Sequence, residues 1–162
     1  MTDEIANQAL RSLRRILRST ELGSRHLAAA TGLTPSQLLV LQEIDRRGEA
    51  IPSAIAGALQ FSQATITSLV DRLAAGGFVV RQRSDRDKRQ VLLRVTAEGR
   101  ALLAGAPDMP QQQFLELFIA LPSWEQAMIL AGLERLSSLL GADAIDAAPL
   151  LDAGAIDRAR PG

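Results

Sequence analysis

Apolar residues recur every three to five positions over residues 4–30, which predicts one long amphipathic helix. A second helix is expected after Thr34, because Thr34 and Gln37 form a capping box and Pro35 suits the first turn. Gly48 suits the end of that helix. The beginning of the chain is therefore predicted to be helical on both sides of a short loop.

Two shorter helices with a tight turn between them are predicted next. Pro52 opens one at about 52–59, and Ser62 is positioned to cap another at about 63–75. If Gln60 in the turn adopts the left-handed backbone conformation, that conformation costs about 1 kcal/mol of folding free energy. Residues at the i, i+3, i+4 and i+7 positions of the second helix should form its buried stripe: Ile66, Leu69, Val70 and Leu73.

The pattern then changes to that of a β-hairpin. Residues 78–83 and 90–95 are rich in β-branched and apolar side chains, and the stretch between them is polar and charged. Thr96 is expected to cap a further helix, and helix resumes after Pro110.

The last predicted helix starts with a second capping box, formed by Ser123 and Gln126. It places four apolar residues on one stripe: Ile129, Leu133, Leu136 and Leu140. Residues 142–162 are rich in Ala, Asp, Gly and Pro, so we expect an extended acidic tail. The fold class is therefore mainly α-helical with a small β-hairpin wing.

Composition excludes several kinds of function. The 162 residues include no cysteine and one histidine, His26, so disulfides, thiol chemistry and a His-rich metal site are not expected. No apolar run approaches the ~18 residues that span a bilayer, and the first residues lack the apolar core of a signal peptide. No catalytic motif of convincing spacing is present. We therefore expect a cytoplasmic protein that is not an enzyme, needs no cofactor and has no membrane partner.

Positive charge is concentrated in the hairpin. The formal net charge of the chain is zero, yet residues 78–100 hold seven basic and three acidic side chains, a net +4. A phosphate backbone responds to local charge within a Debye length of about 8–10 Å. Arg86, Lys88 and Arg89 in the tip could enter a narrow minor groove, or they could simply form a solvated turn.

The helix at 63–75 has an exposed face that suits a DNA groove. With Gln63 and Thr65 on the flanks, the side opposite its buried stripe carries mostly small side chains and a single arginine: Ala64, Thr67, Ser68, Asp71 and Arg72. Such side chains can bond to base edges while the backbone comes close to the DNA. The alternative is a polar helix face that carries few long charged side chains.

These segments together resemble the MarR family of bacterial winged helix-turn-helix regulators. The resemblance covers about residues 30–105 and is carried by TPSQLLVLQEI, IPSAIAGALQFSQATITSLVDRLAAGGFVVR and DRDKRQVLLRVTAEGRALL. Its most specific parts are Asp87-x-Arg89 and Val95-Thr96-x-x-Gly99. The resemblance implies that the helix at 62–75 enters the major groove and that residues 78–95 form the wing.

The resemblance also implies roles for single residues. Arg89 would be the wing arginine and Asp87 its bracing partner, with Arg86 as the competing candidate. The candidate DNA contacts are Ser62, Gln63, Thr65, Thr67, Ser68, Arg72, Arg86, Lys88 and Arg89. An effector pocket between helices would be lined by Arg18, Leu22, Arg25, His26, Leu38 and Gln42.

We therefore expect a homodimeric repressor that binds double-stranded DNA at a palindromic operator and responds to a small organic effector. The expected parts are an N-terminal dimerisation helix (1–30), a DNA-binding domain (31–100), C-terminal dimerisation helices (101–141) and the tail (142–162). The alternative is a winged-helix module that binds protein without reading DNA, since fold alone does not fix function.

Overall fold

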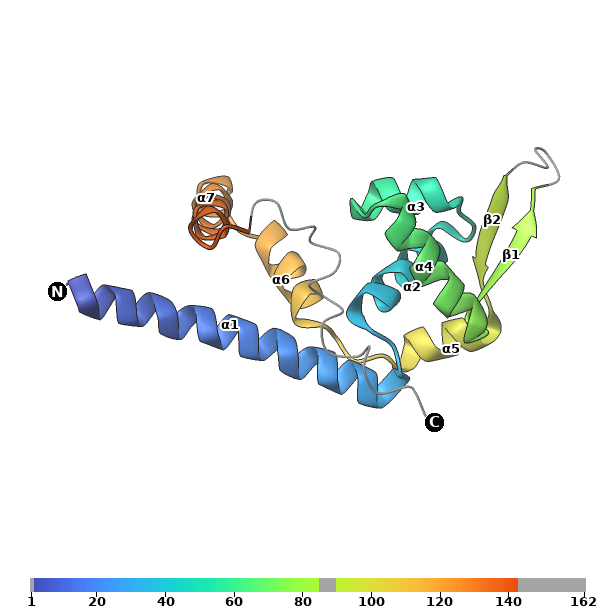
Figure 1. The fold of residues 1–162 in the computed structure, drawn as a ribbon, viewed down its shortest axis with the longest axis horizontal. Coiled ribbons are helices and arrows are strands. Elements are labelled where there is room, and N and C mark those ends of the chain that lie inside the picture. Colours follow the sequence, from blue (N-terminus) through green and yellow to red (C-terminus); the bar gives the residue numbers. More distant parts are fainter. Residues whose placement is uncertain (1, 85–89, 143–162) are drawn as a thin grey trace. The chain divides into compact units, whose positions relative to one another are not determined.

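The computed structural model describes residues 2–84 and 90–142, which form helices and one hairpin (Figure 1). The predicted class, mainly helical with a β-hairpin, is confirmed. The elements in chain order are α1 (Thr2–Thr31), α2 (Pro35–Arg47), α3 (Pro52–Leu59), α4 (Gln63–Ala75), β1 (Val79–Arg83), β2 (Val91–Val95), α5 (Ala97–Gly105), α6 (Pro110–Ile119) and α7 (Ser123–Leu139).

The described residues divide into two compact units. Residues 24–107 form one unit, which holds α2 to α5 and the hairpin, while residues 2–23 and 108–142 form the other. The division falls inside α1, between Gly23 and Ser24. Each unit is described separately below.

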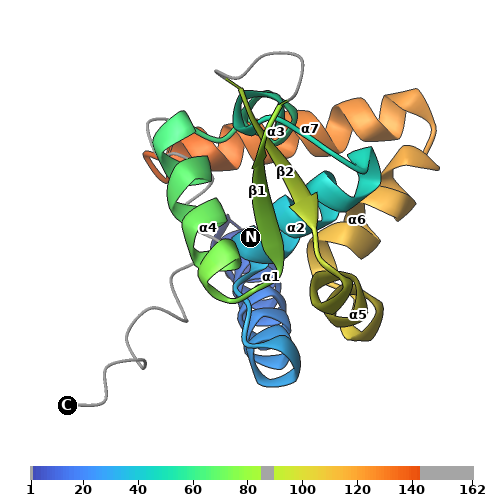
Figure 2. The same ribbon diagram turned by 90° about the vertical axis from the view of Figure 1, so that its right-hand side faces the viewer.

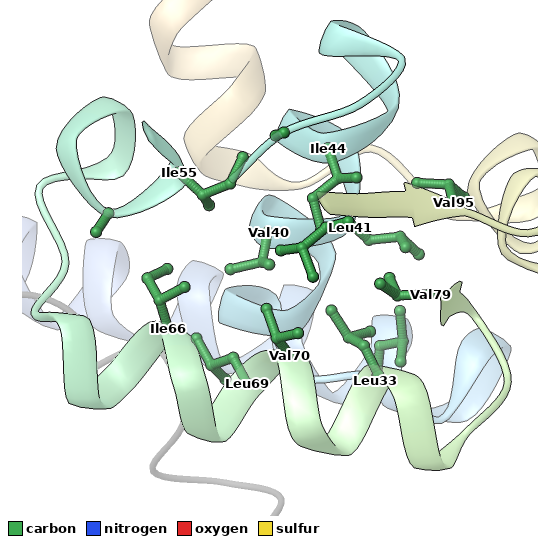
Figure 3. Close-up of a cluster of buried hydrophobic side chains, with 14 residues drawn as sticks. Leu33, Val40, Leu41, Ile44, Ile55, Ile66, Leu69, Val70, Val79 and Val95 are labelled. Atoms are coloured by element: carbon green, nitrogen blue, oxygen red, sulfur yellow. The ribbon is translucent and has the colours of Figure 1, made fainter. Parts of the chain in front are cut away.

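The 24–107 unit is built around one apolar cluster (Figure 3). Helix α2 begins at the predicted capping box, in which Thr34 accepts from the Gln37 N–H and the Gln37 side chain accepts from the Thr34 N–H. Val40, Leu41 and Ile44 of α2 are fully buried in this cluster. The predicted stripe of α4 packs against them, each of its four side chains being at most 3% exposed. Burial of each such side chain contributes about 1.5–3 kcal/mol, so it fixes the rotation of α4 about its own axis.

The hairpin extends from this cluster beside α4 (Figure 2). Strands β1 and β2 pair antiparallel, from Val79 opposite Val95 to Arg83 opposite Val91. Val79, Leu93 and Val95 are buried in the cluster and so anchor the hairpin. A further bridge joins Leu93 to Ala50, before α3.

In the other unit, α6 begins close to α1. A Cβ added at Gly23 of α1 would lie 2.7 Å from the Pro110 ring, so the missing side chain permits the contact. The Phe114 and Phe118 rings of α6 pack 5.2 Å apart. The predicted capping box at Ser123 is wrong: Pro122 occupies the N-cap, and the Gln126 amide donates to the Ile119 and Leu121 carbonyls instead.

The apolar residues of α7 do not form the single stripe that the sequence predicts. The helix ends at Leu139, so Leu140 lies at its C-cap. Large apolar side chains are also exposed on its other sides, including Trp124, Met128 and Leu130. No residue of α6 or α7 that the structure describes is buried, whereas Met109, at the N-cap before α6, is 5% exposed.

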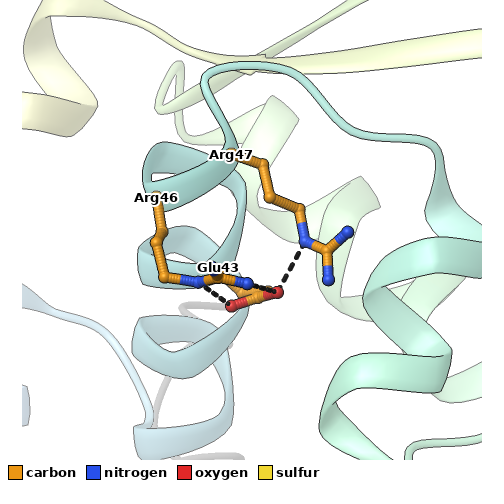
Figure 4. Close-up of polar contacts among 3 residues, drawn as sticks. All are labelled: Glu43, Arg46 and Arg47. Carbon is orange, nitrogen blue, oxygen red and sulfur yellow. Dashed lines mark hydrogen bonds and ion pairs between the residues drawn. The ribbon is translucent and has the colours of Figure 1, made fainter.

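The C-terminal end of α2 is held by a three-residue ion cluster (Figure 4). The Glu43 carboxylate accepts two hydrogen bonds from Arg46 and one from Arg47. The hydrogen bond from Arg46 lowers the pKa of Glu43 from 4.5 to about 2, against the opposing effect of burial. The cluster therefore stabilises the folded chain only while Glu43 is ionised.

We expect Glu43→Gln to lower the free energy of unfolding at pH 7 by about 1–2 kcal/mol. The value is modest because the Arg46 side chain is 66% exposed and solvent screens the pair. Since folding lowers this pKa from 4.5 to about 2, the stabilisation is complete above pH 4.5 and is lost as the pH falls through 2.

The measurement is urea unfolding of both variants at fixed protein concentration and several pH values. Asp45→Asn, which removes an exposed carboxylate from the same helix, is the control. A deficit in Glu43→Gln that persists undiminished at pH 2 would contradict this assignment.

Candidate nucleic-acid interface

The turn between α3 and α4 sets where α4 begins. Gln60 takes the left-handed conformation, with φ 56° and ψ 34°, which meets the condition under which the sequence implies a conformational cost. The Phe61 N–H bonds back to the Ala56 carbonyl at 3.1 Å, which closes a Schellman-type helix end. Ser62 then caps α4, and its hydroxyl accepts from the Thr65 N–H at 3.1 Å. The two helices are thus joined by three residues, which is the arrangement of a helix-turn-helix.

The predicted contact residues of α4 fall into two groups, according to whether their side chains already form hydrogen bonds within the helix and its cap. The Ser62 and Thr65 hydroxyls lie 2.8 Å apart and bond to each other, so both already serve the helix cap. The Thr67 hydroxyl donates to the Gln63 carbonyl at 2.9 Å, which leaves its oxygen to accept. No described residue bonds to three further exposed side chains: Gln63, Ser68 and Arg72.

The hairpin presents two arginines on the side of α4. Alternate residues of a strand point to the same face, so Arg81 and Arg83 of β1 lie on the same face as the buried Val79. Arg81 forms an ion pair with Asp71 of α4, whereas no described residue pairs with Arg83. Our sequence reasoning counted both arginines in the local charge but did not select them. The signal was the alternation from Val79 through Arg81 to Arg83, once the buried face of the strand is known.

The base of the wing is held by the residues of the Val-Thr-x-x-Gly pattern. The Thr96 hydroxyl donates to the Gly77 carbonyl and also accepts from the Gly99 N–H, so it caps α5. A Cβ at Gly99 would lie only 2.4 Å from the Phe78 carbonyl oxygen. Glycine is therefore required for α5 to start this close to the wing.

Residues 85–89 of the wing tip lie outside the described residues. The proposed contacts Arg86, Lys88 and Arg89, and the bracing role of Asp87, therefore stay predictions.

The residues proposed for an effector pocket are divided between the two units. Arg18 and Leu22 belong to the unit of residues 2–23 and 108–142, and the other four belong to the 24–107 unit. Arg25 and His26 are exposed, Gln42 is half-buried, and Leu38 is only 2% exposed. The pocket stays a prediction.

The net charge also differs between residues 24–107 and the rest of the chain. Residues 24–107 contain eleven Lys or Arg and seven Asp or Glu, a net +4, so the remaining residues carry −4 in a chain of net charge zero. The positive part is the one that holds α4 and the wing. Within the described ranges, no cluster of His, Asp or Glu could hold a metal ion, and no helix is long and apolar enough to cross a membrane.

A helix-turn-helix followed at once by an anchored β-hairpin defines a winged-helix protein. The family model described as the MarR family matches residues 33–91. Two regulators of Bacillus subtilis are similar in sequence. The transcriptional repressor YetL is 35% identical over 80 residues, 48% of each chain, and the uncharacterised regulator YfiV is 27% identical over 126 residues, 78% of this chain and 79% of its own. The match to YetL thus spans about half of that repressor.

Solved structures agree with these matches. BpsR of Bordetella bronchiseptica, whose DNA binding is regulated by 6-hydroxynicotinic acid, is 26% identical with a TM-score of 0.58, covering 78% of this chain and 91% of its own. A mutant MarR from E. coli in complex with operator DNA is 25% identical with a TM-score of 0.53, covering 80% and 96%. Residues 33–91 therefore match the MarR family of transcriptional regulators, and the two solved structures share the fold of the chain.

We expect Gln60→Gly to raise the free energy of unfolding by about 0.5–1 kcal/mol. Glycine removes the cost of the left-handed conformation, although it loses more chain entropy on folding. Urea unfolding at fixed protein concentration measures the change. Gln60→Ala, which keeps the left-handed cost, should stay within about 0.5 kcal/mol of the unsubstituted chain. A loss of stability in Gln60→Gly would show that the turn is not strained at this position.

Proposed function

We propose that the chain is a sequence-specific DNA-binding transcriptional repressor that acts in the cytoplasm as a homodimer on a palindromic operator. It acts by binding and not by catalysis. The observation that carries the proposal is the α4 surface: exposed polar side chains to which no described residue bonds, beside two arginines that the hairpin presents on the same side.

In this proposal α4 lies in the major groove and its exposed side chains reach base edges. The Gln63 amide can form paired hydrogen bonds with adenine, and Ser68 can bond to several bases. Thr67 can only accept through its hydroxyl oxygen, because its proton is used within the helix. Ala64 and Ser68 are small and exposed, which lets the helix backbone approach the groove.

The wing supplies the contacts with the DNA backbone and the minor groove. Arg83, exposed and without a described partner, is placed to bind a phosphate. By family resemblance Arg89, braced by Asp87, would enter the minor groove, with Arg86 and Lys88 beside it. The MarR complex with operator DNA and the repressor YetL support DNA binding and repression over the alternative of a protein-binding module.

We expect α4 and wing substitutions to affect DNA binding differently. Gln63→Ala should change the preferred base at one operator position and cost about 1–3 kcal/mol on the original sequence. Arg83→Ala should weaken binding to all sequences and reduce the salt slope by about one unit. Arg89→Ala, compared with Arg86→Ala, should weaken operator binding by about 1–3 kcal/mol.

Selection from a random duplex library defines the operator, and fluorescence anisotropy at several salt concentrations measures each variant. Arg94→Ala is the control for Arg83→Ala, because it removes the same charge from the opposite face of the hairpin. Equal losses on operator and random DNA for Gln63→Ala would contradict the placement of α4 in the groove.

The dimer is proposed from the uncovered terminal helices. Exposed large apolar residues occur on α1, α6 and α7, and they are far more numerous than in the 24–107 unit. Contiguous apolar surface of this kind marks an interface. A dimer that binds two half-sites of a palindrome must hold its two α4 helices about 34–36 Å apart, one turn of DNA.

Sedimentation at micromolar concentration should therefore show a dimer. Leu133→Glu should produce monomers and reduce operator affinity by at least tenfold, because a charge would be buried in the interface. Ser138→Glu adds the same charge to α7 on the face opposite Ile129, and this variant should remain dimeric. A monomeric parent chain would overturn the proposed assembly.

We further propose that an anionic or amphipathic organic molecule releases the DNA by favouring a dimer with a different separation of its α4 helices. The regulation of BpsR by 6-hydroxynicotinic acid and the two arginines Arg18 and Arg25 support this class. A 100-fold preference for the non-binding form corresponds to about 2.7 kcal/mol per site.

We expect a thermal-shift screen of aromatic acids to give compounds that also weaken operator binding in a gel shift. Arg25→Ala and His26→Ala should reduce the response to such compounds while leaving ligand-free operator binding intact. Compounds that stabilise the protein but leave operator affinity unchanged would exclude this mechanism.

A further inference from the structure

Asp71 places a negative charge on the surface that α4 would turn toward DNA. At 3.6 residues per turn, Asp71 lies close to the line of Ala64 and Ser68, opposite the buried stripe. Its side chain is 57% exposed. A carboxylate here would face the phosphates that flank the groove and would repel them.

Arg81, in strand β1 of the wing, forms an ion pair with this carboxylate. One terminal nitrogen of the Arg81 guanidinium donates to Asp71 Oδ1, and the arginine side chain is 41% exposed. The pair joins α4 to β1 and has no net charge. Asp71 neutralises the charge of Arg81 and occupies one terminal nitrogen of its guanidinium, so this arginine attracts a phosphate less strongly than a free arginine would.

We propose that Asp71 is a specificity-determining residue of the DNA-binding surface. It suppresses binding to non-operator DNA in two ways: it neutralises the charge of Arg81, and it repels phosphates itself. Specificity is a difference between affinities, so weaker binding to the wrong sequences raises it without any added operator contact. This inference rests on the proposed function, because it concerns the same surface.

The wing contains a second ion pair that serves as a matched control. Arg94 of β2 pairs with Glu49, and these two side chains are 51% and 47% exposed, close to the values for Arg81 and Asp71. Arg94 lies opposite Val80 in the register, so it is on the other face of the hairpin from Arg81. Glu49→Ala and Asp71→Ala thus each remove one carboxylate and free one arginine of the wing, but on opposite faces.

The experiment measures anisotropy of a labelled random-sequence duplex between 50 and 200 mM salt, and of the selected operator under the same conditions. Asp71→Ala should bind the random duplex about tenfold more tightly at low salt, with a salt slope steeper by about one unit, as one added phosphate contact predicts. Its operator affinity should rise less, so the ratio of operator to random affinity should fall several-fold. Glu49→Ala should change the random affinity by less than about twofold.

The double variant Asp71→Ala/Arg81→Ala should lose most of the gain, because the freed arginine is the added contact. Thermal unfolding of every variant separates these effects from a loss of stability, which would weaken binding to both DNAs alike. A random affinity of Asp71→Ala equal to that of Glu49→Ala or to the parent would overturn the inference, as would a double variant that keeps the full gain. If the parent chain binds the operator and Asp71→Ala or the double variant gives one of these contrary results, the proposed function stands and only the role of Asp71 fails. If the parent chain binds no DNA, the proposed function itself fails.

Discussion

A helix that reads a groove must be fixed in rotation, since a turn of one residue would exchange the side chains it presents. In this chain the rotation of α4 about its axis is fixed by the burial of four side chains against α2 and the base of the hairpin: Ile66, Leu69, Val70 and Leu73. The buried stripe determines by geometry which residues remain outside. The polar face, the reach of the wing arginines and the Asp71–Arg81 pair all depend on that packing.

Local patterns in the sequence predicted the elements of the 24–107 unit well. Helical spacing located α4, the capping box located the start of α2, and the β-branched runs located the hairpin. Each of these signals is contained within a few neighbouring residues. The sequence marked Gln60 as a strained position only on the condition that the turn is left-handed there, and the structure meets that condition.

The parts that sequence did not predict depend on tertiary contacts. Asp71 and Arg81 are ten positions apart, and Glu49 and Arg94 are 45 apart, so their pairing requires the register of the hairpin. At Ser123 the pattern was misleading: a proline already started the helix, and Gln126 found carbonyl partners in the preceding turn. Helix α7 has exposed apolar residues on several sides, and the core of the 24–107 unit forms without them. Their burial requires another surface, so the stability of the terminal helices should depend on protomer concentration.

Thr96 connects three parts of the unit through one side chain and its neighbouring backbone. Its hydroxyl joins the turn after α4 to the first turn of α5, and its N–H bonds to the Phe78 carbonyl at the start of the wing. The approach of Gly99 to the same carbonyl leaves no room for these parts to slide past one another. The wing base, the end of α4 and the start of α5 are therefore joined by direct contacts. In the proposed release of DNA, an effector would then change the separation of the two α4 helices in the dimer and leave the shape of each DNA-binding surface intact.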